Sequence, residues 1–465
     1  MGDDAKIVLI IVGCIALAAF VYAVEAGYLE LPQFNQTIEN VIDSSIAFNQ
    51  KVEPELRTQF AVNPTKQVRM FISLKDNESI KELQSKGIKI IRKGKYVNYA
   101  VVEGNYKDLQ KIVSIRGVNK VYDDKKVRIL DFDFKGLDIN KLPVKPAIVS
   151  GGWNLQAIKA DTAQNNNFTG SNAVVAVIDT GVNHHLPDLD DGYLEGWDFA
   201  ENDSEPDDEF DHGTLVASII AGEGDNIYKG VAPDAHYYAL KALNDEGWGN
   251  MSDVIAAMEW VLDKINEGEK IDVVSMSYGS DTPTVEEQQI CDLLYSKGVI
   301  LVAASGNEGY TTSLYPAGYD SVISVAANDV SSNVAAFSNG GALVSAPGVQ
   351  VPALSTDGTI KYVDGTSFAT PHVSGALLLV ESRKDLTPQQ AFNLLSISTN
   401  AINDPADKVQ HGQIDCIKMV NNALNLNLSD YRSIWDYLKE PYVQILMGLF
   451  ILAGMKIFVW KRSEA

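Results

Sequence analysis

Residues 364–375 read DGTSFATPHVSG, and this stretch places a serine at the start of a helix. A Gly-Thr turn leads into Ser367, and the apolar residues that follow keep helical spacing to Val380. Serine is common at helix N-caps, so the ordinary interpretation is a capping residue. The same geometry leaves the backbone N–H of Ser367 pointing outward, where the helix dipole favours an anion. Ser367 is therefore a candidate nucleophile.

Outward from this helix, residues 153–424 alternate short apolar strands with helical stretches. Short runs of Val, Ile and Ala separated by helices indicate an α/β fold, a mostly parallel sheet with helices on both faces. Active sites of such folds lie at the carboxyl ends of the strands. The predicted strands are Val174–Ile178, Tyr237–Leu240, Val273–Met276, Val299–Ala304 and Val322–Ala326, and the helices include Ser252–Ile265 and Val285–Ser296.

Three further polar residues occupy positions suited to chemistry. Asp179 ends the first predicted strand. A carboxylate buried there needs a partner, because burying a lone charge costs several kcal/mol. His212 begins an apolar helical stretch, and neutral imidazole is the usual general base near pH 7. Asn307 follows the strand Val299–Ala304, where its amide could donate to a developing oxyanion.

Each of these residues also has an ordinary interpretation: a capping carboxylate, a surface or core histidine, and an Asn-rich turn. The sequence Asp179-Thr-Gly also occurs in aspartic proteases, but those enzymes need two such carboxylates sharing a proton, and this chain has one Asp-Thr-Gly. His372 lies five residues after Ser367, about 140° around a helix, so it is a poor base for that serine.

In the order Asp179, His212, Asn307 and Ser367, these motifs resemble the subtilisin-like serine proteases over roughly residues 153–424. The resemblance implies that Ser367 Oγ attacks a peptide carbonyl. His212 would take the proton and pass it to the leaving amine, while Asp179 orients the imidazole. Asn307 and the Ser367 N–H would bind the oxyanion. The implied activity is hydrolysis of protein and peptide substrates through an acyl-enzyme.

Two loops resemble the substrate-binding edges of this family, which hold a peptide as an added strand; plain loop is the ordinary interpretation. They comprise Gly247, Trp248 and Gly249 in one loop and Ser277, Tyr278 and Gly279 in the other. The S1 pocket, which receives the residue before the scissile bond (P1), would include Ala303–Gly306. This segment carries no charge, which favours a large apolar or mixed P1 side chain.

Residues 198–211 hold eight carboxylates in fourteen positions, and an isolated acidic loop is usually only solvated. Here the spacing resembles a calcium loop that some family members carry just before the catalytic histidine. Hard oxygen ligands in a flexible loop suit Ca²⁺. The predicted ligands are Asp198, Glu201, Asp203, Glu205 and Asp207.

Residues 66–130 have a βαββαβ order of predicted elements, which indicates a small split-βαβ domain. This segment resembles the inhibitory propeptide of the family, which helps the enzyme to fold and covers its cleft. Its end, Val-Arg-Ile-Leu130, is in register with a family propeptide C-terminus and predicts self-cleavage after Leu130. Residues 25–65 are predicted to form a helical stalk, 131–152 a linker and 153–426 the peptidase domain.

The two ends of the chain are predicted to be membrane anchors. Ile7–Val24 is an uncharged run of 18 residues, so residues 1–24 are predicted as a signal-anchor. The alternative is a cleaved secretory signal, which usually has a basic rather than an acidic start. Tyr442–Trp460 is a second predicted span, with a buried core helix as the alternative. Residues 427–441 would be juxtamembrane and 461–465 a cytoplasmic tail.

The cations Lys461 and Arg462 after the second span predict that both termini are cytoplasmic and that the catalytic domain lies outside the cytoplasm. With 61 acidic and 38 basic residues the net charge is −23, which disfavours nucleic acid as a partner. Three Cys are too few for a disulfide scaffold, and Cys291 and Cys416 could pair or stay free. The predicted partners are peptide substrates, the chain's own propeptide and the membrane.

The leading interpretation is a membrane-tethered, self-processed endopeptidase. One alternative is an inactive descendant kept as a binding domain. Another question is whether the enzyme processes a few membrane-associated substrates or degrades proteins broadly.

Overall fold

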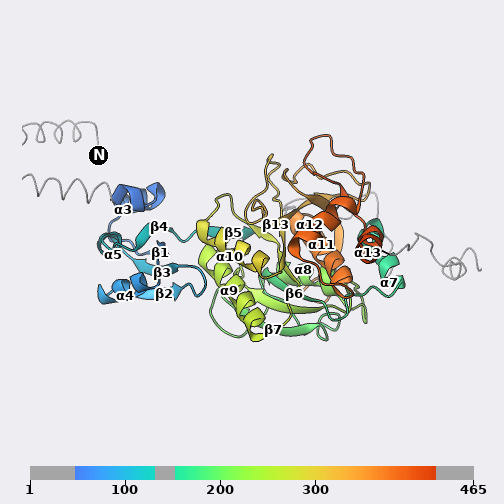
Figure 1. Ribbon diagram of the computed structural model, residues 1–465, viewed down its shortest axis with the longest axis horizontal. Helices are drawn as coiled ribbons and strands as arrows, with labels where there is room; N and C mark the ends of the chain where they lie inside the picture. The colour runs from blue at the N-terminus through green and yellow to red at the C-terminus, as the bar shows by residue number, and fades with distance from the viewer. Residues whose placement is uncertain (1–47, 131–151, 426–465) are drawn as a thin grey trace, which may run out of the picture. The chain divides into compact units, whose positions relative to one another are not determined.

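The computed structural model of the chain describes residues 48–130 and 152–425 (Figure 1). The chain divides into two compact units, with the boundary between Lys125 and Lys126. Residues 126–130 therefore belong to the second unit, whereas the sequence placed the end of the first domain at Leu130.

The first unit contains a four-stranded antiparallel sheet with strand order β2-β3-β1-β4. The strands and helices follow the predicted βαββαβ order. One more helix, α3 (Pro54–Val62), precedes them, at the end of the predicted stalk. The elements are β1 (Val68–Leu74), α4 (Glu78–Ser85), β2 (Ile90–Lys93), β3 (Tyr99–Gly104), α5 (Tyr106–Val113) and β4 (Val118–Asp123).

The core of the first unit lies on one face of this sheet. Met70 and Ile72 of β1 point to that face and pack in one cluster with Leu83 of α4 and Leu109 of α5. Leu56 of α3 is also fully buried in this cluster. The described end of the predicted stalk is therefore part of the packed unit.

The second unit is built on a nine-stranded sheet with strand order β17-β18-β14-β13-β12-β10-β6-β8-β7. Its neighbouring strands are parallel except for β17 and β18. The strands are β6 (Val174–Asp179), β7 (Tyr193–Asp198), β8 (His236–Lys241), β10 (Val273–Met276), β12 (Ile300–Ala304), β13 (Val322–Asn328), β14 (Val344–Pro347), β17 (Thr399–Asn400) and β18 (Gln413–Ile414).

Helices cover both faces of this sheet. Val175 and Val177 of β6 belong to the core shared with α8 and α11, and Ala176 and Ile178, which point to the opposite face, are also fully buried. Helix α11 packs beside α8, and α9 packs beside α10 (Figure 1). The helices are α6 (Trp153–Ala157), α7 (Ala160–Asn165), α8 (His212–Ala221), α9 (Met251–Glu267), α10 (Val285–Ser296), α11 (Thr366–Glu381), α12 (Pro388–Ile397) and α13 (Cys416–Leu424).

The mostly parallel α/β architecture predicted for this region is confirmed. The five predicted strands are present, and the sheet also contains β7, β14, β17 and β18, which the sequence pattern did not show. Strand β7 reads YLEGWD, and β17 and β18 have two residues each, so none presents a continuous apolar run. A two-stranded sheet is formed by β15 (Val351–Leu354) and β16 (Ile360–Val363).

A separate three-stranded antiparallel sheet has the order β11-β5-β9. Its central strand is β5 (Lys126–Ile129), and the two outer strands are β9 (Trp248–Asn250) and β11 (Tyr278–Gly279). The outer strands contain residues of the two predicted substrate-binding loops. The segment that ends at Leu130 therefore lies between these two edges.

Both predicted membrane spans and nearly all of the predicted linker lie outside the described residues. Within residues 48–130 and 152–425, none of the helices has the length and apolar character needed to cross a bilayer. Cys291 and Cys416 are both buried with free thiols.

Candidate active site

Asp179 and His212 form a buried pair at the carboxyl end of the sheet. Asp179 is the last residue of β6, and His212 is the first residue of α8. His212 Nδ1 lies 2.6 Å from Asp179 Oδ1, and both residues are only 1% exposed. Because Nδ1 faces the carboxylate, Nε2 is the ring atom that can exchange a proton with a substrate or a nucleophile.

The turn that follows Asp179 is joined to α8 by a second buried carboxylate, Asp208. Its Oδ1 accepts a hydrogen bond from Thr180 Oγ1 at 2.9 Å, and its Oδ2 accepts from the Thr214 N–H and hydroxyl at 2.8 and 2.7 Å. Asp208 thus connects the residue after Asp179 to the first turn of the helix that begins with His212. Asp208 is one of eight carboxylates in its loop, and its sequence position alone does not distinguish it from the others.

Ser367 is the second residue of α11 and therefore lies in the first turn of the helix, as predicted. Its Oγ lies 2.8 Å from the Leu130 carbonyl oxygen and 2.8 Å from the Ser277 carbonyl oxygen, and its one proton can be donated to either. The ring of Phe368, the next residue, lies 5.3 Å from the His212 ring between centroids. The start of α11 is therefore beside the imidazole. At Gly365 (φ +150°) an added Cβ would come within 2.7 Å of the Leu130 oxygen, so glycine permits this approach.

The side chain of Asn307 is oriented by Thr366. Asn307 Oδ1 accepts from the Thr366 N–H at 3.0 Å and from Thr366 Oγ1 at 2.9 Å. The amide nitrogen must then face the opposite way, and Nδ2 donates to the Leu130 carbonyl oxygen. Asn307 and Ser367 thus contact the same oxygen.

The loop that carries Asn307 is held by Asn339, which sequence reasoning missed. Asn339 is fully buried, and its Oδ1 accepts from the N–H groups of Glu308 and Tyr310 at 3.0 and 2.9 Å. Its Nδ2 donates to Glu308 Oε2 at 3.0 Å. Gly306 (φ +114°) lies against this amide, and an added Cβ would meet Asn339 Nδ2 at 2.2 Å. The signal available in the sequence was only an Asn-Gly-Gly turn.

Leu130 occupies a small apolar pocket. It is fully buried and clusters with Ala304 and Leu314. Ala304 belongs to the segment Ala303–Gly306 that the sequence assigned to the S1 floor. An added Cβ at Gly279 would lie 3.0 Å from a Leu130 methyl group, so the edge strand β11 also closes on this side chain.

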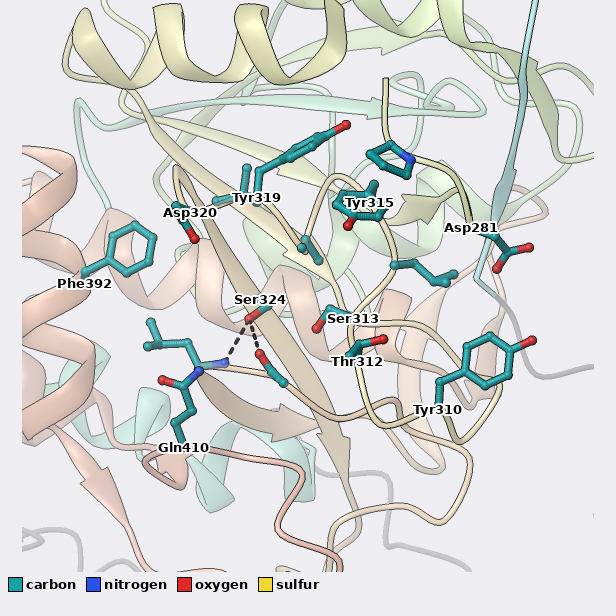
Figure 2. Close-up of a pocket in the computed structure, with 17 residues that line it drawn as sticks. Asp281, Tyr310, Thr312, Ser313, Tyr315, Tyr319, Asp320, Ser324, Phe392 and Gln410 are labelled. Carbon is teal, nitrogen blue, oxygen red and sulfur yellow. Dashed lines mark hydrogen bonds between the residues drawn. The ribbon is translucent and has the colours of Figure 1, made fainter. Parts of the chain in front are cut away.

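A cavity of about 830 Å³ adjoins the Leu130 pocket, since Leu314 lines both (Figure 2). Its wall includes Leu314, Tyr315, Tyr319 and Phe392, and Ser324 lies inside it with hydrogen bonds to the Leu343 N–H and the Gly341 carbonyl oxygen. None of Asp179, His212, Asn307 and Ser367 lines this cavity. Ser367 and Asn307 contact the Leu130 carbonyl oxygen instead.

His372 does not take part in this arrangement. Burial lowers the pKa of His372 to about 4, so the ring is neutral at physiological pH. Its Nδ1 donates to the Phe368 carbonyl oxygen at 2.7 Å, and its Nε2 accepts from Asn154 Nδ2 at 2.9 Å. Both ring nitrogens are occupied, in agreement with the prediction that His372 is a poor base for Ser367.

The predicted calcium loop does not bring its carboxylates together. Asp198 Oδ1 accepts from the N–H groups of Ala200 and Glu201, and Asp203 Oδ1 accepts from the Glu205 N–H. Asp207 lies instead near two imidazoles, 3.8 Å from His184 and 4.0 Å from His185.

Among the described residues, no three converging His, Cys, Asp or Glu ligands come from the predicted set. The five residues as placed therefore do not fit a calcium ion, and no catalytic step is assigned to one.

A family model described as the subtilase family matches residues 170–413, just over half of the chain. The chain belongs to the subtilase family. This subtilase is a subtilisin-like serine endopeptidase.

The chain is similar to several bacterial proteases. It is 39% identical to the thermophilic serine proteinase of Bacillus sp. (strain AK1) over 47% of this chain and 55% of that protein, so the match spans about half of that relative. It is 39% identical to subtilisin BL of Lederbergia lenta over 50% of this chain and 84% of that protein. It is 36% identical to subtilisin DY of Bacillus licheniformis over 54% and 92% of the two chains.

Proposed function

We propose that this subtilase is made as a zymogen that cleaves its own chain after Leu130. The observation that supports the proposal is the position of the Leu130 carbonyl oxygen, which accepts from both Asn307 Nδ2 and Ser367 Oγ. A peptide bond whose oxygen lies against the nucleophile and an amide donor is in the place of a substrate.

In the proposed reaction, Ser367 Oγ attacks the carbonyl carbon of Leu130, and its proton passes to His212 Nε2. The Asp179 carboxylate at Nδ1 stabilises the imidazolium that forms. The oxygen of the tetrahedral intermediate is stabilised by Asn307 Nδ2 and by the Ser367 N–H, which has no acceptor within its helix because it lies in the first turn of α11. His212 then protonates the leaving amine of Asp131, and water hydrolyses the acyl-enzyme.

After cleavage, residues 126–130 would remain between β9 and β11 and block the cleft. Strand β5 pairs with Trp248 and Gly249 on one side and with Tyr278 and Gly279 on the other. Leu130 also keeps its apolar pocket. Dissociation or degradation of the N-terminal segment would therefore be needed before other substrates enter.

We also propose that the enzyme is held at the membrane. The predicted spans at residues 1–24 and 442–460, with Lys461 and Arg462 after the second, support a catalytic domain outside the cytoplasm. Cleavage after Leu130 would release the enzyme from the first anchor and leave the second. Carbonate extraction of membranes should retain both fragments, and external protease should reach an epitope in residues 153–426 but not one after Lys461. Recovery of both fragments in the soluble fraction would contradict tethering.

The central experiment compares the wild-type chain with Ser367→Ala. The wild-type protein should yield a fragment beginning at Asp131 and should react with a fluorophosphonate probe, whereas Ser367→Ala should stay at full length and unlabelled. A labelled protein with a start far from Asp131 would contradict the cleavage site. Absence of both cleavage and labelling in a folded wild-type protein would favour the inactive binding domain.

Calcium is a separate proposal that rests on the resemblance, since subtilisins generally bind calcium. Calcium should raise the midpoint of thermal unfolding of the wild-type protein relative to a chelator. Asp198→Asn should leave that increase unchanged, because the carboxylates of the acidic loop do not converge. A smaller increase in Asp198→Asn would assign the calcium site to this loop.

A further inference from the structure

Glu308, the residue after Asn307, contacts the strand that occupies the substrate position. Its Oε1 lies 2.6 Å from an Arg128 guanidinium nitrogen, and the two side chains are 17% and 34% exposed. We propose that Glu308 selects arginine at P3, the third residue before the scissile bond. This inference rests on the proposed function, because it takes residues 126–130 as the substrate strand.

The register of β5 explains why Arg128 reaches Glu308. In an extended strand, residues two apart point to the same side. Arg128 and Leu130 therefore share a side, and Leu130 contacts Ala304 while Arg128 contacts Glu308. The segment from the end of β12 to Glu308 thus lines both the P1 and the P3 positions.

Hydrogen bonds to Asn307 and Asn339 orient the Glu308 side chain independently of the substrate strand. Its Oε2 accepts from the Asn307 N–H at 2.9 Å and from Asn339 Nδ2 at 3.0 Å. The other oxygen, Oε1, is directed at Arg128. A carboxylate oriented in this way loses little side-chain entropy when a guanidinium arrives, and partial burial reduces the screening of the pair by solvent.

The other basic residue of the strand has a different environment. Lys126 Nζ donates to Asn250 Oδ1 at 2.6 Å, a neutral amide oxygen at an exposed position. Residues 126–130 contain two cations, Lys126 and Arg128. Within the described part of the chain, Arg128 at P3 is the one that forms an ion pair. Selectivity for charge should therefore be strong at P3 and weak at P5, the position of Lys126.

The test measures kcat/KM of the processed wild-type enzyme on fluorogenic peptides. The parent peptide is Lys-Val-Arg-Ile-Leu with a coumarin amide leaving group, and its variants carry Gln at P3, Glu at P3 or Gln at P5. A charge-assisted hydrogen bond corresponds to a factor of about ten or more, so Gln at P3 should lower kcat/KM at least about tenfold at low salt. Glu at P3 should lower it further, and Gln at P5 should change it less than about threefold.

Glu308→Gln should reduce the ratio of kcat/KM between the Arg and Gln peptides to within about twofold. The ratio is the informative quantity, because any disturbance of the neighbouring Asn307 affects both peptides equally. Glu269→Gln, which removes an exposed carboxylate on another part of the unit, is the control and should leave the ratio unchanged.

If Glu308→Gln does not fold, wild-type enzyme alone decides the matter. Its preference for Arg over Gln at P3 should fall only modestly as ionic strength rises, because the ion pair is partly buried. Equal kcat/KM for the Arg, Gln and Glu peptides would overturn the P3 inference and leave the endopeptidase proposal intact. Failure to cleave any peptide, together with no fluorophosphonate labelling, would overturn both.

Discussion

The Leu130 carbonyl oxygen accepts a hydrogen bond of 2.8 Å from Ser367 Oγ, a residue 237 positions later in the chain. This contact brings the end of β5 to the start of α11. It also places the same oxygen against Asn307 Nδ2. The proposed nucleophile, the proposed oxyanion donor and a peptide carbonyl therefore meet at one point, and the following predictions test what each partner contributes.

Leu130→Asp should slow self-processing by more than about a hundredfold. The Leu130 side chain is fully buried beside Ala304 and Leu314, and burying an unpaired carboxylate costs about several kcal/mol. Leu130→Met preserves an apolar side chain of similar volume and should process at nearly the wild-type rate. The amount of full-length chain is followed over time on gels. Equal processing rates for the Asp and Met variants would show that this pocket does not select P1.

Asn307→Ala should lower kcat by about 10²–10³ and leave KM within about threefold. The amide donates to the position of the developing oxyanion, and loss of one such donor costs about 3–4 kcal/mol of transition-state stabilisation. Steady-state kinetics on a peptide amide measure both constants. A large rise in KM with unchanged kcat would assign Asn307 to ground-state binding instead.

Thr366→Val tests whether the orientation of that amide matters. The variant loses the hydroxyl that donates to Asn307 Oδ1 at 2.9 Å but retains the Thr366 N–H bond. We expect a fall in kcat of about tenfold, because a misplaced donor stabilises the transition state less well. In the Asn307→Ala background the same substitution should have almost no further effect. Full additivity of the two changes would argue against the orienting role.

Asp208→Asn should destabilise the second unit by about 2–4 kcal/mol and lower kcat. Asp208 accepts hydrogen bonds from Thr180 and Thr214, and bonds to a charged acceptor contribute about 1.5–3 kcal/mol. The control is Asp207→Asn, since the Asp207 side chain is 47% exposed and surface changes usually stay within about 0.5 kcal/mol. Chemical denaturation with chelator present, on a Ser367→Ala background, measures both. Similar losses in the two variants would contradict a specific role for Asp208.

Glu287 should make stability depend on pH. Burial raises the pKa of this fully buried carboxyl from 4.5 to about 7, although Tyr319 donates to it at 2.9 Å. Between pH 4.5 and 7 the unfolded chain therefore releases a proton that the folded chain retains. The contribution of Glu287 to the free energy of unfolding should fall across this window by about 3 kcal/mol and level off above it.

Glu287→Gln should remove this component of the pH dependence, whereas Glu269→Gln, at an exposed position, should not. Urea denaturation of each protein, on a Ser367→Ala background, at several pH values between 4 and 8 provides the comparison. Parallel pH profiles for wild type and Glu287→Gln would show that folding does not raise the pKa of Glu287.

Many of the strands and helices of the second unit could be predicted, because the patterns that indicate them lie in neighbouring residues. Buried parallel strands such as β6 and β12 are continuous apolar runs, and Asp179 and Asn307 lie at their ends or just beyond. Strands β17 and β18 escaped prediction, since two residues do not form a pattern and their pairing is with each other and with β14.

The residues that support the site were harder to find. Asp208 was one of eight carboxylates in its loop, and only its burial and its bonds to Thr180 and Thr214 separate it from Asp207. In the sequence, Asn339 and Glu308 look like ordinary polar residues of turns. Only the structure shows that they are hydrogen-bonded to each other. The predicted calcium ligands have a spacing in the sequence that resembles a calcium loop, but their carboxylates do not converge in the structure.

The sequence by itself determined the α/β fold class, the family and the order of Asp179, His212, Asn307 and Ser367, because motifs and hydrophobic runs are properties of neighbouring residues. Tertiary structure decided which way the Asn307 amide faces and which carboxylate supports the histidine helix. It also decided that Arg128 lies against Glu308. These features depend on burial and on hydrogen bonds between segments that are far apart in the chain, and such partners come together only when the chain is folded.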